Sequence, residues 1–330
     1  MFKRHQNTGS TPDANYLASG TKSFWGVAAA AMIEDGLINS FNEPVSATIC
    51  EWVNDSRKNR ITIRHLLSLT SGLKENMKQL GGLEGRAEDK YAFAINLPAV
   101  SEPGRRFRYG PSHFYVFGEV MKRKLKSCGQ TPLDYLKQRI LDPLDIIIDN
   151  WIHDHAGNPH IPNGAYVAAS DWAKFGLFLL RRGCSNGRQI IRADLLNECF
   201  KGSSANPGYG LAFWLNQPGG MGANKTQRAP KGSVAGWIYP DGYSELIGAL
   251  GSGRTRMYII PSRQLVIVRQ AEKNKKDVFA DSGFLKQILR RDTALTNLEM
   301  ASEHYSGQNE ESRIILSLDK TVVHPVRRGF

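Results

Sequence analysis

A serine and a lysine stand three residues apart in the segment LASGTKSFWG, residues 17–26. On a helix, side chains at positions i and i+3 share a face, so the amine of Lys22 would reach the hydroxyl of Ser19. A serine hydroxyl is a weak nucleophile, and a neighbouring amine is a group that can accept its proton. The pair therefore predicts a nucleophile beside its base. The alternative is that Ser19 only caps a helix and that Lys22 is a solvated side chain.

The pair stands at the start of an apolar segment that continues as VAAAAMI, residues 27–33. An acidic pair and Gly36 follow, and a glycine in this place is typical of a helix C-cap. We therefore expect a helix over residues 19–35. The unpaired amide groups at the start of such a helix carry partial positive charge, which favours a serine alkoxide.

Composition and hydropathy exclude several classes of protein. The chain has 330 residues, of which 41% are hydrophobic and 22% are charged, as in a globular protein with a large core. Its longest apolar stretch, residues 25–33, is far shorter than the roughly 20 residues of a membrane span. The basic first residues are not followed by an apolar segment, so we recognise no signal peptide and the cellular compartment stays open.

Charge, cysteines and histidines give no indication of a nucleic acid or metal partner. The net charge of +12 is dispersed and no nucleic-acid-binding motif accompanies it, so we interpret it as a solvated basic surface. The four cysteines include no CxxC pair and indicate neither a zinc site nor a disulfide framework. The cluster of His153, Asp154, His155 and His160 lacks a recognised ligand spacing, and we expect no metal and no cofactor.

Helical patterns dominate the middle of the chain, and strand patterns follow them. Apolar periodicity predicts a helical turn or two within residues 61–73 and helices over residues 88–97, 112–125, 132–144 and 169–183. Short segments rich in β-branched and aromatic residues predict strands over residues 209–217, 243–251, 256–261 and 264–270, with a helix over residues 278–292.

This order of elements predicts an α/β (α+β) fold, in which helices flank an antiparallel sheet and an all-helical lobe is inserted. We assign residues 1–50 and 209–300 to the sheet lobe, residues 51–208 to the helical lobe, and residues 301–330 to a C-terminal extension. The site is then expected between the two lobes.

Six segments occur in an order that resembles the serine β-lactamase and penicillin-binding-protein-like superfamily, especially its class C β-lactamase and esterase branch. The resemblance runs from about residue 17 to residue 289. It rests on SGTK as the Ser-x-x-Lys motif, IRHLLSLTSGL at residues 63–73, PGRRFRY at residues 103–109, ASDWAKFG at residues 169–176, GYGLAFW at residues 208–214 and GALGSGRTRMYIIP at residues 248–261. Any one of these matches alone would be weak.

The resemblance implies acyl-enzyme chemistry. Ser19 attacks a carbonyl group, with Lys22 and Tyr109 as the two candidate bases, and the sequence does not decide between them. The implied oxyanion hole consists of the backbone amides of Ser19 and Ser252. Gly251 and Gly253 let a substrate approach the strand closely.

Two departures from the family pattern bear on the substrate. Tyr109-Gly110-Pro111 stands where the family has Tyr-x-Asn, and Ala249 stands where the third motif has Lys or His. Both losses argue against a β-lactam or D-Ala-D-Ala substrate and favour a neutral ester or amide.

Further substrate contacts are expected from a small set of residues near these motifs. Arg254 and Arg256 either restore positive charge or face outward from a strand. The other candidates are Gly251, Gly253, Trp151 and Tyr243. For the two aromatic residues, the alternative is a place in the core. His113 is expected to be a packed helix residue.

We therefore expect a serine hydrolase that acts on a small-molecule ester or amide without a cofactor. One alternative is a DD-peptidase or a β-lactamase. Another is a catalytically inactive member of the superfamily that serves as a binding protein.

The amino-terminal segment leaves one edge of the predicted sheet without a partner. Only 18 residues precede Ser19, and their polar sequence predicts no strand, whereas the resembled family has two strands there. We expect the tail from Arg313, residues 313–326, to cover this edge as one or two strands, or a second copy of the chain to do so in a homodimer. The competing explanation is that the chain lacks its natural amino terminus.

Overall fold

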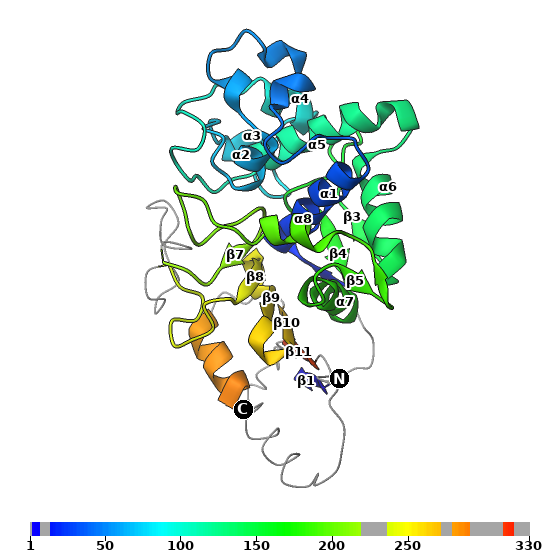
Figure 1. Ribbon diagram of the computed structural model, residues 1–330, viewed down its shortest axis with the longest axis vertical. Helices are drawn as coiled ribbons and strands as arrows, with labels where there is room; N and C mark the ends of the chain where they lie inside the picture. Colours follow the sequence, from blue (N-terminus) through cyan, green and yellow to red (C-terminus); the bar gives the residue numbers. More distant parts are fainter. Residues whose placement is uncertain (1, 7–13, 219–235, 272–278, 291–312, 320–330) are drawn as a thin grey trace, which may run out of the picture.

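The computed structural model describes residues 2–6, 14–218, 236–271, 279–290 and 313–319. A six-stranded sheet lies at one end of the molecule and a group of helices at the other, with the helix α1 (Lys22–Glu34) between them (Figure 1). The strands follow the order β1 (Phe2–Gln6), β11 (Arg313–Asp319), β10 (Leu265–Ala271), β9 (Arg256–Ile260), β8 (Ile247–Leu250) and β7 (Trp214–Leu215).

The sheet is antiparallel from β7 to β10 and parallel at its other edge. β7, β8, β9 and β10 pair with their neighbours in antiparallel register, as predicted. β11 runs parallel to β10, and β1 runs parallel to β11. The α/β fold class is therefore confirmed, with two parallel strands added to the expected antiparallel sheet.

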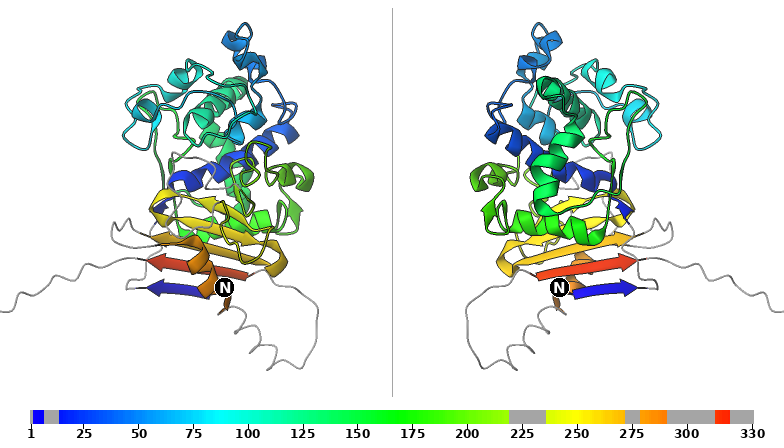
Figure 2. Two further views of the ribbon diagram at one scale, coloured as in Figure 1. Left: turned by 90° about the vertical axis from the view of Figure 1, so that its left-hand side faces the viewer. Right: turned by 90° about the vertical axis from the view of Figure 1, so that its right-hand side faces the viewer.

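Helices cover both faces of this sheet (Figure 2). On one face, α7 (Ala169–Leu180) packs against β9, β10 and β11, and a side chain at Gly176 would lie 2.6 Å from Val266. Successive residues of a strand point to opposite faces. Tyr258 of β9 accordingly contacts Asp281 and Phe284, at the start of the helix formed by residues 281–290 on the other face.

The central helix α1 is buried on all sides because its sequence is apolar all round. Small residues allow close packing: a side chain at Gly26 would lie 2.3 Å from the carbonyl oxygen of Leu211. The helix ends before Gly36, whose φ of 69° is the left-handed conformation predicted for the C-cap. This burial fixes the position of the residues at the start of α1.

The helical lobe contains the predicted helices in shorter pieces. These are α2 (Ile63–Leu67), α4 (Lys90–Ile95) and α6 (Pro132–Leu136), whereas α5 (Ser112–Leu125) has the predicted bounds. Two short helices were not predicted: α3 (Met77–Leu80) and, nearer the sheet, α8 (Ala193–Glu198). A small sheet of β2 (Asn15–Tyr16), β4 (Ala165–Val167) and β3 (Asn150–Trp151), and the hairpin of β5 (Cys184–Ser185) and β6 (Arg188–Gln189), complete the described elements.

Some of the expected elements differ from the structure. The prediction that residues 1–18 contain no strand is wrong, since β1 and β2 lie there. The strand expected over residues 209–217 is confined to β7, because Tyr209 to Phe213 turn back to contact Cys199 and Leu67. The division into lobes at residue 208 stays a prediction, and α7, which precedes this boundary, packs against β9, β10 and β11.

The carboxy-terminal tail supplies β11, on the sheet edge that the sequence left open. Its register pairs residues 265–271 of β10 with residues 313–319. Residues 320–326, which were included in the expected tail strands, lie outside the described residues. The homodimer stays a prediction. Among the helices of the described ranges, none has the length and apolarity that a bilayer crossing requires.

Deleting residues 310–330 removes β11 and should lower the melting temperature by several degrees. The reason is that the backbone donors and acceptors of β10 that face β11 lose their partners, while the pairing with β9 remains. Differential scanning calorimetry of the purified protein measures the effect, and deletion of residues 320–330, which keeps β11, is the control. An unchanged melting temperature in the longer deletion would contradict the role of β11.

Candidate active site

Ser19 and Lys22 come together where a tight turn runs into α1. Ser19 lies in the 3₁₀ turn Ala18–Thr21, and Lys22 is the first residue of the α-helix. The Lys22 amine donates one hydrogen bond to Ser19 Oγ at 3.0 Å and another to the carbonyl oxygen of Pro162 at 3.0 Å. Ala18 has a φ of 48°, which is the left-handed region, directly before the serine. The predicted contact between hydroxyl and amine is therefore present.

Lys22 is buried, with 4% of its surface exposed. Burial lowers the pKa of its amine to about 7, against an opposing effect of the Glu75 carboxylate, because an ammonium ion loses its hydration in the interior. An ordinary lysine is almost fully protonated at neutral pH. Here a large fraction of the amine is neutral and able to accept a proton.

Tyr109 faces the same pair. Its phenol hydrogen-bonds Ser19, and its ring lies 5.1 Å from the Lys22 amine. Trp214 stacks on the ring at 5.4 Å with an angle of 22°, which holds its orientation. Burial raises the pKa of Tyr109 to about 12, despite the hydrogen bond from Ser19 and the positive charge of Arg256, so the phenol is protonated at neutral pH.

The end of β8 closes the site from the sheet side. A side chain at Gly251 would lie 2.1 Å from the carbonyl oxygen of Leu17 and 3.2 Å from the amide of Gly20. The following turn Ser252–Arg254 lies against the turn that carries Ser19, and Gly253 within it has a φ of 73°. Glycine is required at position 251 because any side chain there would push the two turns apart.

Ala249 lies on the same face of β8 as Gly251, because alternate residues of a strand share a face. It is buried, and its methyl group is all that this position presents towards the turn with Ser19. Arg256 does not restore the missing charge. Its guanidinium is buried on the other face, in an ion pair with Asp281 at 2.6 Å, and it also donates to the carbonyl of Gly251. The idea that Arg256 faces outward is therefore wrong.

Arg254 is partly exposed in the turn after β8, beside Ser252. Its backbone carbonyl accepts a hydrogen bond from Arg269 at 2.9 Å. Its φ of 65° is unusual for a residue with a side chain and shows how tightly this turn is bent.

Trp151 and Tyr243 both pack against other aromatic rings. The Trp151 ring packs edge-on against Trp25 at 5.5 Å, is 5% exposed, and donates to the carbonyl of His160. Tyr243 stacks on Tyr239 and lies with Arg263 near the turn between β9 and β10, at the opposite end of β8 from Ser252. Their contact with a substrate stays a prediction.

The histidine cluster is divided between different environments. Asp154 accepts hydrogen bonds from the backbone amides of Lys90 and Asn158, and His160 is buried against the ring of Tyr115. Within the described ranges, no group of three or more His, Cys, Asp and Glu side chains is arranged to hold a metal ion. His113 is buried within α5, as predicted.

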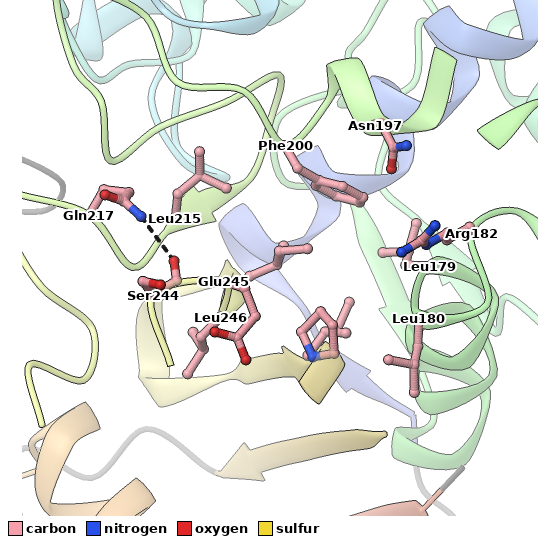
Figure 3. Close-up of a pocket in the computed structure, with 13 residues that line it drawn as sticks. Leu179, Leu180, Arg182, Asn197, Phe200, Leu215, Gln217, Ser244, Glu245 and Leu246 are labelled. Carbon is pink, nitrogen blue, oxygen red and sulfur yellow. Dashed lines mark hydrogen bonds between the residues drawn. The ribbon is translucent and has the colours of Figure 1, made fainter. Parts of the chain in front are cut away.

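A separate cleft of about 340 Å³ opens at the far end of β8 and β9 (Figure 3). Apolar side chains of α7 and of the strands line it, and the Gln217 amide donates to the carbonyl of Ser244 at 3.0 Å across its rim. None of the residues that line this cleft was a predicted site residue.

Two groups that act on Lys22 were not found from the sequence. One is the carbonyl of Pro162, which any residue would supply and which therefore leaves no signal in the residue type. The other is Glu75, whose charge acts on Lys22 and which follows the Thr-Ser-Gly-Leu signature by two positions. The place of Glu75 shortly after this signature is the signal in the sequence that could have pointed to it.

An α/β fold with a lysine beside a serine at the start of its central helix is the arrangement expected of β-lactamase-type serine hydrolases. The chain belongs to the Beta-lactamase family, whose family model matches residues 11–290.

Similar proteins cover most of the chain. The chain is 26% identical over 263 residues to an uncharacterized protein of Alkalihalophilus pseudofirmus. The aligned region covers 77% of this chain and 72% of that protein. Two solved structures share the fold. A candidate β-lactamase of Bacteroides dorei has a TM-score of 0.63 at 19% identity and covers 86% of this chain and 87% of its own. A candidate 6-aminohexanoate-dimer hydrolase of Bacillus anthracis has a TM-score of 0.64 at 15% identity, with coverages of 89% and 76%.

The substitution Gly251→Ala should lower the free energy of unfolding by about 1–3 kcal/mol, because the new methyl group overlaps the carbonyl oxygen of Leu17. Urea unfolding followed by tryptophan fluorescence measures the change. Gly283→Ala is the matched control: it lies in the helix of residues 281–290, and an added methyl group meets no atom within 4 Å. Equal stability of Gly251→Ala and the wild type would contradict the close approach of the two turns.

Proposed function

We propose that this protein is a serine hydrolase that forms an acyl-enzyme on Ser19 and hydrolyses a small, neutral ester or amide. The observation that carries the proposal is the buried Lys22 amine, 3.0 Å from Ser19 Oγ, with a pKa lowered to about 7. Of the two candidate bases, Lys22 fits better, because its neutral form is abundant at neutral pH whereas the phenolate of Tyr109 is rare.

In the proposed first step, Ser19 Oγ attacks the substrate carbonyl as its proton passes to the Lys22 amine. The carbonyl oxygen becomes an oxyanion, which the backbone amides of Ser19 and Ser252 are suited to bind, since their two turns lie against each other. Tyr109, protonated and bonded to Ser19, is positioned to give its proton to the leaving group and to recover one from Lys22. Water then attacks the acyl group, and Lys22 again takes the proton. The bond between the acyl carbon and Ser19 Oγ breaks, Ser19 Oγ takes this proton from Lys22, and the acid product leaves.

The preference for a neutral substrate rests on Ala249. A methyl group at this position offers no positive charge to a substrate carboxylate, and the nearby guanidinium of Arg256 is already paired with Asp281. The stacked rings of Tyr109 and Trp214 give the site an apolar wall, against which an acyl or alkyl group would pack.

The substitution Ser19→Ala should abolish hydrolysis of p-nitrophenyl acetate and butyrate, because no other group in the proposed site forms the acyl intermediate. Intact-mass spectrometry with a fluorophosphonate should find one adduct on the wild type and none on the variant. Ser262→Ala, which changes an exposed serine in the turn after β9, is the control and should keep full activity.

Other results of the same experiment separate the alternatives. Faster turnover of nitrocefin than of the esters would favour a β-lactamase. A folded wild type with neither turnover nor adduct would favour a binding protein without catalytic activity.

The rate constant kcat/KM for ester hydrolysis should rise with pH through about 7 and then level off. The sign follows from Lys22: its pKa is lowered to about 7, and only the neutral amine above that pH accepts the proton of Ser19. Stopped-flow assays across the neutral range measure the profile. Tyr109→Phe should keep this acid limb while lowering kcat by roughly 10²–10⁴-fold. A rate that does not change through neutral pH would exclude Lys22 as the base.

A further inference from the structure

The carboxylate of Glu75 is held at the amino-terminal end of α5. Its Oε2 accepts hydrogen bonds from the backbone amide of Ser112 at 3.3 Å and from the Ser112 hydroxyl at 2.9 Å. α5 is a helix of 14 residues, and the positive end of its dipole favours a negative charge at this place. Glu75 is therefore a fixed carboxylate rather than a mobile surface side chain, with 11% of its side chain exposed.

The second carboxylate oxygen lies beside His113. His113 Nε2 is 2.9 Å from Glu75 Oε1, but its hydrogen bond goes to the carbonyl of Arg108 at 3.0 Å. The Ser71 hydroxyl lies 2.7 Å from His113 Nδ1, so the imidazole is fixed on both sides. Glu75 Oε1 is buried and has no hydrogen bond to any residue of the described ranges.

Gly110 is what allows this carboxylate so close to Tyr109. A side chain at Gly110 would lie 2.0 Å from Glu75 Oε2 and from its carboxyl carbon. This is the middle position of Tyr109-Gly110-Pro111, where the sequence departs from the Tyr-x-Asn of the resembled family. The space that a side chain would need at position 110 is filled here by the carboxylate.

Lys22 and Glu75 both border the segment 109–114. The Lys22 amine lies 5.1 Å from the ring of Tyr109 and 5.5 Å from the ring of Phe114, and Glu75 contacts Gly110 and Ser112 of the same segment. Both charged groups are largely shielded from water. Coulombic interactions are much stronger in such surroundings than at an exposed surface.

We infer that Glu75 is a positioning residue of the site, whose fixed negative charge sets the charge state of the Lys22 amine and with it the pH range in which Ser19 is activated. The part of this inference that concerns the activation of Ser19 rests on the proposed function. Glu75 acts against burial: burial lowers the pKa of Lys22, and the carboxylate raises it. Without Glu75, the amine would be neutral at a lower pH and would also be a weaker base.

The other titratable groups around Lys22 have different effects. Tyr109 is a neutral phenol at neutral pH, since burial raises its pKa to about 12. His160, on the segment that supplies the Pro162 carbonyl, is neutral because burial lowers its pKa to about 4. Arg256, behind the sheet, is a permanent cation that is paired with Asp281 and acts on Tyr109.

Of the groups on α5, His113 touches Glu75 itself. Ser112 contributes only uncharged donors to the carboxylate. In the described part of the chain, Glu75 is thus the anion that opposes the effect of burial on the pKa of Lys22.

The direct test is a titration of the Lys22 amine in the full-length protein, by NMR of ¹³Cε-labelled lysine. The Lys22→Arg variant identifies the resonance by its loss. We expect Glu75→Gln to lower the pKa of Lys22 by about one pH unit, since it removes a charge but keeps the size of the side chain. Glu102→Gln, which removes a partly exposed carboxylate paired with Arg57, is the control and should leave the titration unchanged. An unchanged titration in Glu75→Gln would overturn the inference.

A second variant keeps the inference testable if Glu75→Gln does not fold. Gly110→Ala retains the carboxylate but forces it away from the segment 109–114, and it should also lower the pKa of Lys22. A pKa equal to that of the wild type in folded Gly110→Ala would count against the inference.

The rate of fluorophosphonate labelling of Ser19 links the titration to chemistry. In Glu75→Gln, the acid limb of this rate should move to lower pH by the same amount as the Lys22 titration. If the wild type is not labelled at all, the proposed function fails, and the NMR titration still decides whether Glu75 sets the charge of Lys22.

Discussion

The buried amine of Lys22 needs hydrogen-bond acceptors, and the rest of the site is arranged around the two groups that supply them. Lys22 gives up its hydration in the interior and receives two acceptors, Ser19 Oγ and the carbonyl of Pro162. An amine without such partners would be costly to bury. One acceptor comes from the turn before α1 and the other from a segment 140 positions further along the chain, so the site exists only when these parts are assembled.

The sheet reaches the turn that carries Ser19 through one glycine, Gly251. Gly251 allows β8 to touch the turn at Leu17, and the buried guanidinium of Arg256 donates to the carbonyl of the same glycine. Arg256 is in turn fixed by Asp281, on the helix behind the sheet. The two faces of the sheet therefore have different contacts: one face borders the turn that carries Ser19, and the other face anchors the backbone of that border through Arg256 and Asp281.

The sequence was informative where the chemistry is local. Ser19 and Lys22 are one helical turn apart, so their spacing alone predicted their contact. It was not informative where a contact depends on distant parts of the chain. The burial of Arg256 depends on Asp281, and the role of Glu75 depends on Gly110 and Ser112, so neither has a signature in its own segment. For Trp151 and Tyr243 the substrate contact stays a prediction, because an aromatic residue near a strand does not reveal which way its ring faces.

The edge of the sheet joins the two ends of the chain. Phe2 of β1 pairs with Ile315 of β11, so this contact spans nearly the whole sequence. A chain made from its amino terminus has β10 complete well before β11 exists, and β1 has no partner during all that time. Contacts of such long range also form slowly. Until β11 arrives, β10 presents an open strand edge to other chains, for a period set by the speed of translation rather than by the stability of the finished fold.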